Sequence, residues 1–277
     1  MTDKTGPFEE PIRIFSDLHL GGPGSHIDDI EQLRPLLKGA KTVIFNGDTY
    51  EERIPEVYDH SVKMLEELRA LCNELEIRAV FVTGNHDPTI SDVHYLDLCD
   101  GRFFVTHGDL LFSDITPWSR EVDAIRDKIS EIDDRYGSEP TYDLDLAISR
   151  LCELRSAIEA HPLPTARTNI FAKLIWAALE FWPPRRSLGV LSVWQVSPHL
   201  ARDVLRRFRP DAECLIMGHT HRRQVALHHP RHYLNTGAFS SGLGKYMVEV
   251  LHDQLWIYKI RKRDGLWHPA KRRHFGE

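Results

Sequence analysis

The 277-residue chain is long enough for one large domain or a domain with an insertion, and 42% hydrophobic residues suffice for a packed core. Its formal net charge of -6 gives no general attraction to nucleic acid. Four cysteines without CxxC spacing indicate neither a thiolate zinc site nor a disulfide framework, and favour a reducing cytoplasm.

The sequence shows no export or membrane-spanning signal. Residues 1–11 are polar and acidic, without the basic start and apolar segment of a secretory signal. The most apolar stretch, residues 171–182, is interrupted by Lys173 and Glu180, so it falls short of a spanning helix. We therefore expect a cytoplasmic protein.

Apolar runs and helical stripes alternate along the first hundred residues. Strands are expected at 11–15, 42–45 and 77–82, and helices at 27–37 and 55–75, with Pro35 disfavouring the last turn of the first helix. This alternation indicates an α/β domain, in which polar loops at strand ends commonly carry the chemistry. Further strands are expected at 103–106, 212–217, 224–227, 232–234, 247–251 and 255–260.

Five of the expected strands end in a short polar cluster. A single Asp-x-His pair is more often a cap beside a surface histidine, but recurrence in this form indicates a site. Oxygen and nitrogen donors without sulfur favour manganese, iron or zinc, and their number is consistent with a two-metal site for displacement at phosphorus. The clusters are Asp17-Leu18-His19, Gly47-Asp48, Gly84-Asn85-His86-Asp87, His107-Gly108-Asp109 and Gly218-His219-Thr220-His221.

In this order, the five clusters resemble the motifs of the calcineurin-like metallophosphoesterase superfamily, over residues 16–221. The resemblance implies an α/β fold, an αββα sandwich around two sheets, and a hydrolase with two divalent cations, Mn²⁺ or alternatively Fe²⁺ or Zn²⁺. The family pattern, carried onto this sequence, assigns one ion to Asp17, His19, Asp48 and His221, and the other to Asp48, Asn85, His107 and His219.

The resemblance leaves His86 without a ligand role. We interpret His86 as the group that protonates or stabilises the leaving oxygen, with Asp87 orienting its ring. Glu51 follows Asp48 in the same loop, and we interpret it as a solvated acid in preference to a supporting group.

A narrower resemblance concerns the substrate. Ser16-Asp17-Leu18-His19-Leu20-Gly21, His107-Gly108-Asp109 and Gly218-His219-Thr220-His221-Arg222 are similar to motifs of the UDP-2,3-diacylglucosamine pyrophosphohydrolases of lipid A synthesis. This implies cleavage of an amphiphilic nucleotide-sugar to a lipid monosaccharide phosphate and UMP. His86 departs from the principal branch of that family, which has arginine there. Two alternatives stay open: a soluble phosphodiesterase or phosphatase for nucleotides or nucleic acid, and a metal-binding scaffold without catalysis.

The segment between His107 and His219 is too long for a simple connection. We predict a helical cap at 110–210, inserted into a core formed by 1–109 and 211–277. Residues 169–182 are apolar on nearly all sides, and residues 185–209 hold six arginines against one acid. The apolar run fits a buried cap helix at least equally well, but together these stretches predict an amphiphilic phosphate ligand. The predicted substrate-binding residues are Trp176, Trp182, Arg185 and Arg186.

The C-terminal residues 259–273 hold seven lysines or arginines against Asp264. We interpret this run as a solvated basic end that can strengthen contact with an anionic membrane surface. Peripheral association with the inner face of the membrane is therefore expected, and no protein or nucleic-acid partner is predicted. Asn235-Thr236-Gly237 is expected to form a turn that supports the site.

Overall fold

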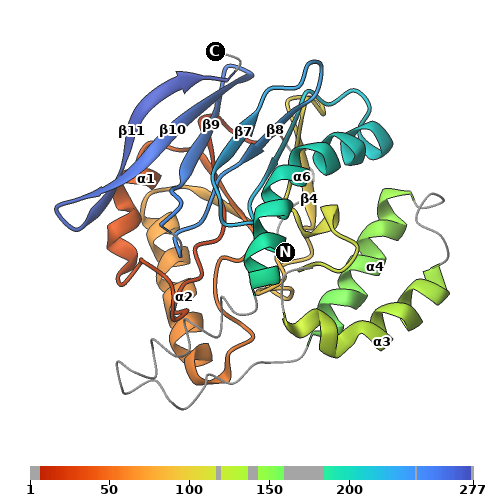
Figure 1. Cartoon of the computed structure of the whole chain (residues 1–277). Coiled ribbons are helices and arrows are strands. Elements are labelled where there is room, and N and C mark those ends of the chain that lie inside the picture. Colours follow the sequence, from red (N-terminus) through yellow and green to blue (C-terminus); the bar gives the residue numbers. More distant parts are fainter. Residues whose placement is uncertain (1–6, 117–119, 137–142, 159–183, 241, 276–277) are drawn as a thin grey trace.

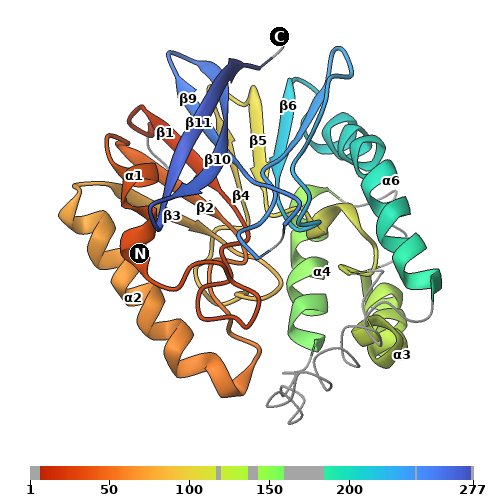
Figure 2. The same cartoon turned by 60° about the vertical axis from the view of Figure 1, so that its left-hand side comes forward.

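The computed structural model describes residues 7–116, 120–136, 143–158, 184–240 and 242–275. Two β-sheets pack face to face, and helices cover the outer face of each sheet (Figure 2). This is the αββα sandwich expected from the resemblance, and the predicted fold class is confirmed.

The first sheet has six strands in the order β11-β10-β9-β1-β2-β3. The three strands β1, β2 and β3, at one side of the sheet, are parallel neighbours, and every residue of β2 is buried, as its run of apolar and β-branched residues predicts. The strands are β1 (Ile12–Phe15), β2 (Thr42–Asn46), β3 (Arg78–Val82), β9 (Tyr246–Leu251), β10 (Gln254–Arg263) and β11 (Leu266–His274).

The second sheet has five strands in the order β4-β5-β6-β8-β7, with β5, β6 and β8 parallel. Fully buried side chains fill the space between the two sheets, among them Ile14, Ile44 and Val82 from the first and Val105 and Ile216 from the second. The strands are β4 (Tyr95–Leu98), β5 (Phe103–Thr106), β6 (Cys214–Met217), β7 (Gln224–Ala226) and β8 (His232–Asn235).

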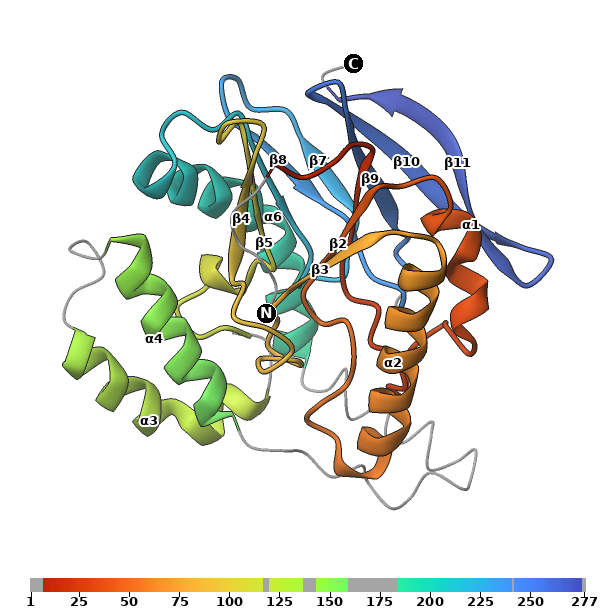
Figure 3. The same cartoon turned by 180° about the vertical axis from the view of Figure 1, so that it is seen from behind.

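The outer face of the first sheet is covered by η1 (Ile30–Leu33), α1 (Arg34–Leu37), η2 (Pro55–Val57) and α2 (Tyr58–Glu74). The helix expected at 27–37 is thus a 3-10 turn followed by one α-helical turn. Pro35 lies in the first turn of α1, where its missing N–H costs no hydrogen bond, so it begins a helix here. α1 also contacts β11, as Figures 1 and 3 show.

The outer face of the second sheet is covered by η3 (Asp109–Leu111), α3 (Arg120–Tyr136), α4 (Leu144–Ala157) and α6 (Pro184–Phe208). Leu154 of α4 and Leu205 of α6 share one apolar cluster with Phe104 and Leu215 of the sheet. The described part of the predicted cap therefore packs as a layer of the sandwich. The division into a core and a cap at 110–210 stays a prediction.

Residues 259–273, interpreted as a solvated basic end, have mostly exposed lysines and arginines, but they form part of a sheet. These residues lie in the antiparallel β10–β11 hairpin at the edge of the first sheet (Figure 1). Trp267 is buried there, and its ring lies 5.4 Å from that of Phe239. In the parts of the chain that the structure describes, no helix is long and apolar enough to cross a membrane.

Two leucines test this assignment of the core. Leu68 in α2 is 0% exposed, so Leu68→Ala should lower the free energy of unfolding by about 2–5 kcal/mol. Leu191 in α6 is 50% exposed, and Leu191→Ala should change the free energy of unfolding by less than about 0.5 kcal/mol. Urea denaturation measures both, and equal losses would contradict the described packing of α2.

Candidate dinuclear metal centre

The five polar clusters meet at one end of the sandwich, after the carboxyl ends of β1, β2, β3, β5 and β6. Asp17, His19, Asp48 and His221 each offer a ligand atom, and these atoms lie within 4.8 Å of one another. Asp48, His107 and His219 form a second group by the same measure. Asp48 belongs to both groups, as expected for a carboxylate shared by two cations.

In the first group, nitrogen and oxygen donors face one another. His19 Nε2 lies 3.1 Å from His221 Nε2 and 3.8 Å from an oxygen of Asp48. His221 Nε2 also lies 3.3 Å from Asp17 Oδ1. The four side chains therefore converge on one small space.

The second group converges on His107 Nε2. This nitrogen lies 3.3 Å from Asp48 Oδ2, 3.2 Å from Asn85 Oδ1 and 3.3 Å from His219 Nδ1. The structure thus brings together all seven predicted ligands, including the neutral oxygen of Asn85. Their roles as ligands stay a prediction.

The chemistry of this donor set fits two divalent cations. Asp17 and Asp48 are 0% and 1% exposed, and buried carboxylates need a counter-charge. All the converging atoms are oxygen or nitrogen, which suits manganese, iron or zinc. The residues present can therefore hold the cations that the family resemblance implies.

The pKa values show how the protein alone balances these charges. Burial raises the pKa of Asp48, but the charges on His107, His86 and His19 together outweigh burial and hold it well below its usual range. Burial lowers the pKa of His107, yet Asp48 outweighs it and raises the pKa to about 10. Burial and then the charge on His107 lower the pKa of His219 to about 4. Cation binding would therefore displace the proton of His107.

Five of the predicted ligands have a backbone conformation that side chains other than glycine rarely adopt. Their φ angles are 53° at Asp17, 47° at His19, 51° at Asp48, 66° at His219 and 55° at His221. Such unusual backbone angles concentrated in one place are typical of functional sites, since the surrounding structure must maintain them.

Asp87 does not orient the ring of His86 in the predicted manner. Its buried carboxylate accepts hydrogen bonds from the backbone N–H groups of Asp48 at 3.0 Å, Thr49 at 2.6 Å and Gly84 at 2.8 Å. Burial and then the charge of Asp48 raise its pKa to about 7. Asp87 thus joins the Asp48 loop to the Gly84 loop.

The carboxylate beside His86 belongs to Glu51, whose interpretation as a solvated acid was wrong. Glu51 is 3% exposed, and both of its oxygens lie 3.0 Å from His86 Nδ1. Burial raises its pKa, but the charge on His86 and the hydrogen bonds with His19 and His86 together outweigh burial and lower it to about 2. The sequence signal was its position three residues after Asp48, although nothing in the pattern distinguished it from the exposed acids of other loops.

A cavity of about 230 Å³ opens beside the cluster and is lined by Asp48, Asn85, His86, His219 and His221. Val193, Trp194 and Leu243 also line it, giving an apolar wall next to the polar centre. Trp194 Nε1 donates a hydrogen bond to the carbonyl of Thr220 at 3.0 Å, which fixes this ring beside the ligand loop.

None of the four predicted substrate-binding residues is among the described residues that line this cavity. Arg185 and Arg186 lie at the N-terminal end of α6, and Trp176 and Trp182 lie outside the described residues. The arginines and tryptophans stay predictions, and Trp194 is a lining residue that the sequence did not distinguish from other apolar residues of the same stretch.

The expected turn at Asn235-Thr236-Gly237 does support the site. Asn235 Nδ2 donates to the carbonyl of Gly218 at 2.5 Å and to Thr220 Oγ1 at 3.0 Å, while Asn235 Oδ1 accepts from the N–H of Gly237 at 2.8 Å. This amide therefore holds the backbone on both sides of His219.

A glycine substitution tests the packing around Asp17. A Cβ on Gly218 would lie 2.0 Å from Asp17 Oδ2 and 2.2 Å from Ser16 Oγ, so Gly218→Ala must displace this carboxylate. We expect affinity for Mn²⁺ to fall about 10–100-fold, measured by titration of the metal-free protein. Gly189→Ala in α6, where a Cβ has no neighbour within 4 Å, is the control. Unchanged affinity in Gly218→Ala would contradict the placement of Asp17.

Comparisons with known proteins agree with the fold. The family described as calcineurin-like phosphoesterase matches residues 10–223. A comparison with curated proteins finds no match.

Three solved structures are similar to this chain. Wild-type Vps29 complexed with Zn²⁺ from Entamoeba histolytica is 15% identical, with TM-score 0.41, over 96% of this chain and 99% of that one. A predicted phosphoesterase from Streptococcus pneumoniae is 15% identical, with TM-score 0.37, over 95% and 96%. A cold-active protein-tyrosine phosphatase from a Shewanella species is 10% identical, with TM-score 0.39, over 94% and 80%.

The family match covers most of the chain and includes every residue of the two donor groups. The chain therefore belongs to the calcineurin-like phosphoesterase family.

Proposed function

We propose that this protein is a two-metal hydrolase of phosphoester or pyrophosphate bonds. The observation that carries the proposal is the complete donor set around Asp48, beside a cavity that a phosphate group can enter. A scaffold that had lost catalysis would be expected to lack donors, and none of the seven is missing. Manganese is the first cation to test, with iron and zinc as alternatives.

Asp17, His19, Asp48 and His221 would hold one cation, and Asp48, Asn85, His107 and His219 the other. Two such cations supply a nucleophile at neutral pH and neutralise charge on the phosphate oxygens. The protein fixes the donors through the strand ends, while Asp87 and Asn235 hold the loops between them. Preorganised donors of this kind lower the cost of assembling charge at the reacting centre.

His86 is the proposed proton donor to the leaving oxygen. Its side chain is 35% exposed and lines the cavity, so its ring can reach a bound substrate. Glu51 accepts a hydrogen bond from the Nδ1–H of His86 at 3.0 Å, and its negative charge stabilises the protonated ring. Glu51 therefore takes the orienting role that the sequence analysis gave to Asp87.

For the substrate we propose an amphiphilic nucleotide-sugar pyrophosphate similar to UDP-2,3-diacylglucosamine. Support comes from the narrower motif resemblance and from Val193, Trp194 and Leu243, which line the cavity beside His86. Each acyl CH₂ buried on such a surface contributes about 0.8 kcal/mol, so a long acyl chain can dominate the choice between a lipid and a water-soluble substrate. The alternative is a water-soluble phosphodiester or phosphomonoester.

One assay tests the reaction and the substrate together. At equal Mn²⁺, we expect hydrolysis of UDP-2,3-diacylglucosamine to exceed that of UDP-N-acetylglucosamine, a cyclic nucleotide and single-stranded DNA. Asp48→Asn should abolish activity and metal uptake. Preference for any water-soluble substrate would remove the lipid proposal alone, whereas full activity after chelation of all metal would refute the two-metal proposal.

A double-mutant cycle tests the pairing of His86 with Glu51. His86→Ala should keep normal metal content while lowering turnover about 10²–10⁴-fold, because it removes a general acid. Glu51→Gln should slow the native enzyme and have a smaller further effect in the His86→Ala background, since Glu51 acts mainly through that ring, although its Oε2 also lies 3.7 Å from His19 Nδ1. Additive losses, or loss of metal in His86→Ala, would contradict these roles. His219→Ala is the control, in which metal binding itself should weaken.

A further inference from the structure

A buried ion pair lies behind the second donor group. Arg155 of α4 is 1% exposed, and its Nε and Nη2 donate to the two oxygens of Asp109 at 2.7 and 2.8 Å. Asp109 is 0% exposed. Such a two-bond arrangement between guanidinium and carboxylate fixes orientation as well as charge.

The same guanidinium also reaches the loop of Asn85. Nη1 of Arg155 donates to Thr83 Oγ1 at 2.6 Å, and Nη2 donates to the carbonyl of Thr83 at 3.2 Å. Thr83 precedes Asn85 by two residues and follows β3 of the first sheet, whereas Asp109 follows His107 by two residues, after β5 of the second. One side chain therefore connects the two loops across the interface between the sheets.

A second arginine, Arg53, also connects the Asn85 loop to the end of α4. Its Nε donates to the backbone carbonyl of Asn85, and its Nη1 donates to that of Ile158. Its Nη2 donates to the carbonyl of Arg155 at 2.5 Å. The C-terminal end of α4 and the Asn85 loop are thus connected by one guanidinium.

We propose that Arg155 is a positioning residue for the cation held by Asn85, His107 and His219. Its hydrogen bonds within the described ranges go to Asp109 and Thr83, beside His107 and Asn85, and not to the loops of Asp17 and His19. Loss of Arg155 would therefore affect one of the two cations more than the other. This inference rests on the proposed two-metal centre and assigns α4 a function in assembling it.

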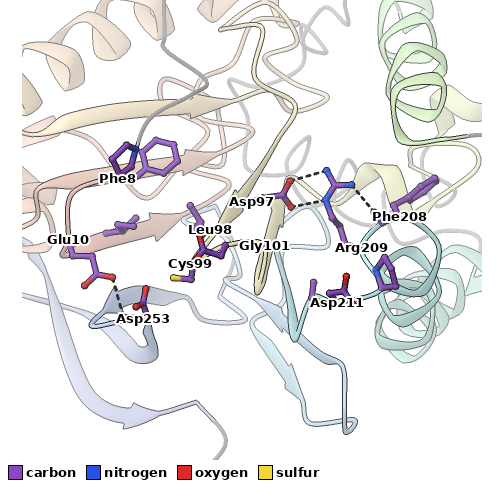
Figure 4. Close-up of a pocket in the computed structure, with 15 residues that line it drawn as sticks. Phe8, Glu10, Asp97, Leu98, Cys99, Gly101, Phe208, Arg209, Asp211 and Asp253 are labelled. Carbon is purple, nitrogen blue, oxygen red and sulfur yellow. Dashed lines mark hydrogen bonds and ion pairs between the residues drawn. The ribbon is translucent and has the colours of Figure 1, made fainter.

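The test compares Arg155→Met with Arg155→Lys and with a matched control. Arg209 pairs with both oxygens of Asp97 at 2.8 and 2.9 Å. Arg209 precedes β6 and Asp97 lies in β4, whereas the predicted ligands His107 and His219 follow the carboxyl ends of β5 and β6. Arg209 and Asp97 line a cavity of about 820 Å³, which Figure 4 shows. Arg209→Met removes a two-bond ion pair without touching the ligand loops, although Arg209 is more exposed than Arg155.

Metal uptake is measured on metal-free full-length protein by Mn²⁺ titration and by elemental analysis after dialysis. The native protein and Arg209→Met should bind two equivalents. Arg155→Met should keep one equivalent near native affinity and bind the second at least about 10-fold more weakly. Arg155→Lys should give a smaller defect, because one ammonium keeps the charge but cannot form the fork to Asp109 and Thr83 together. The electron paramagnetic resonance spectrum of bound Mn²⁺ should change from a coupled pair to a single ion in Arg155→Met.

Two equivalents at native affinity in both Arg155 variants would overturn the proposal. Equal weakening of both equivalents would also overturn it, because that result indicates a general role in the fold. If Arg155→Met does not fold, Arg155→Lys decides by the same criteria, and unfolding of both variants counts against a positioning role. If the native protein binds no Mn²⁺, Fe²⁺ or Zn²⁺, the proposed two-metal function itself fails. This result is distinct from failure of the positioning role, in which the native protein binds two equivalents and the Arg155 variants bind them equally well.

Discussion

The structure depends on holding the buried carboxylate of Asp48 among three histidines and a second buried carboxylate, Asp17. Burying the ionised carboxylate of Asp48 is costly unless positive charge lies beside it. Without cations, a protonated His107 supplies part of that charge, because Asp48 and the neighbouring carboxylates raise its pKa to about 10. Divalent cations would supply it more completely. The donor loops, their unusual backbone angles and the surrounding amide hydrogen bonds all maintain this arrangement.

The centre lies across the interface between the two sheets, so its geometry depends on how the sheets pack. Asp17, Asp48 and Asn85 follow strands of the first sheet, while His107 and His219 follow strands of the second. The fully buried apolar residues between the sheets therefore fix the separation of the two sets of ligands. Polar links cross the same interface: Asn46 Nδ2 donates to the carbonyl of Thr106 at 2.8 Å, and Asn46 O lies 3.1 Å from His107 Nδ1.

The sequence was sufficient to predict which side chains converge, because their clusters follow apolar strands and match the motifs of the family in order. It was insufficient for the residues that support them. Asp87 binds backbone amides and Glu51 is buried against His86, and both outcomes depend on how two separate loops meet. The strand β11 was missed because lysines and arginines mask its alternation, leaving Trp267 as a single apolar signal. Residues 159–183, which include the whole apolar stretch 169–182 of the predicted cap, lie outside the described parts of the chain.

The most direct test of the central claim is anomalous X-ray diffraction from crystals of the native protein soaked in Mn²⁺. We expect two peaks that share Asp48, one beside Asp17, His19 and His221 and the other beside Asn85, His107 and His219. Glu10, Cys99 and Asp253 form a further group of potential ligands beside the cavity of Figure 4 and serve as an internal comparison. Peaks only at that group, or none at Asp48, would contradict the assignment of a dinuclear metal centre.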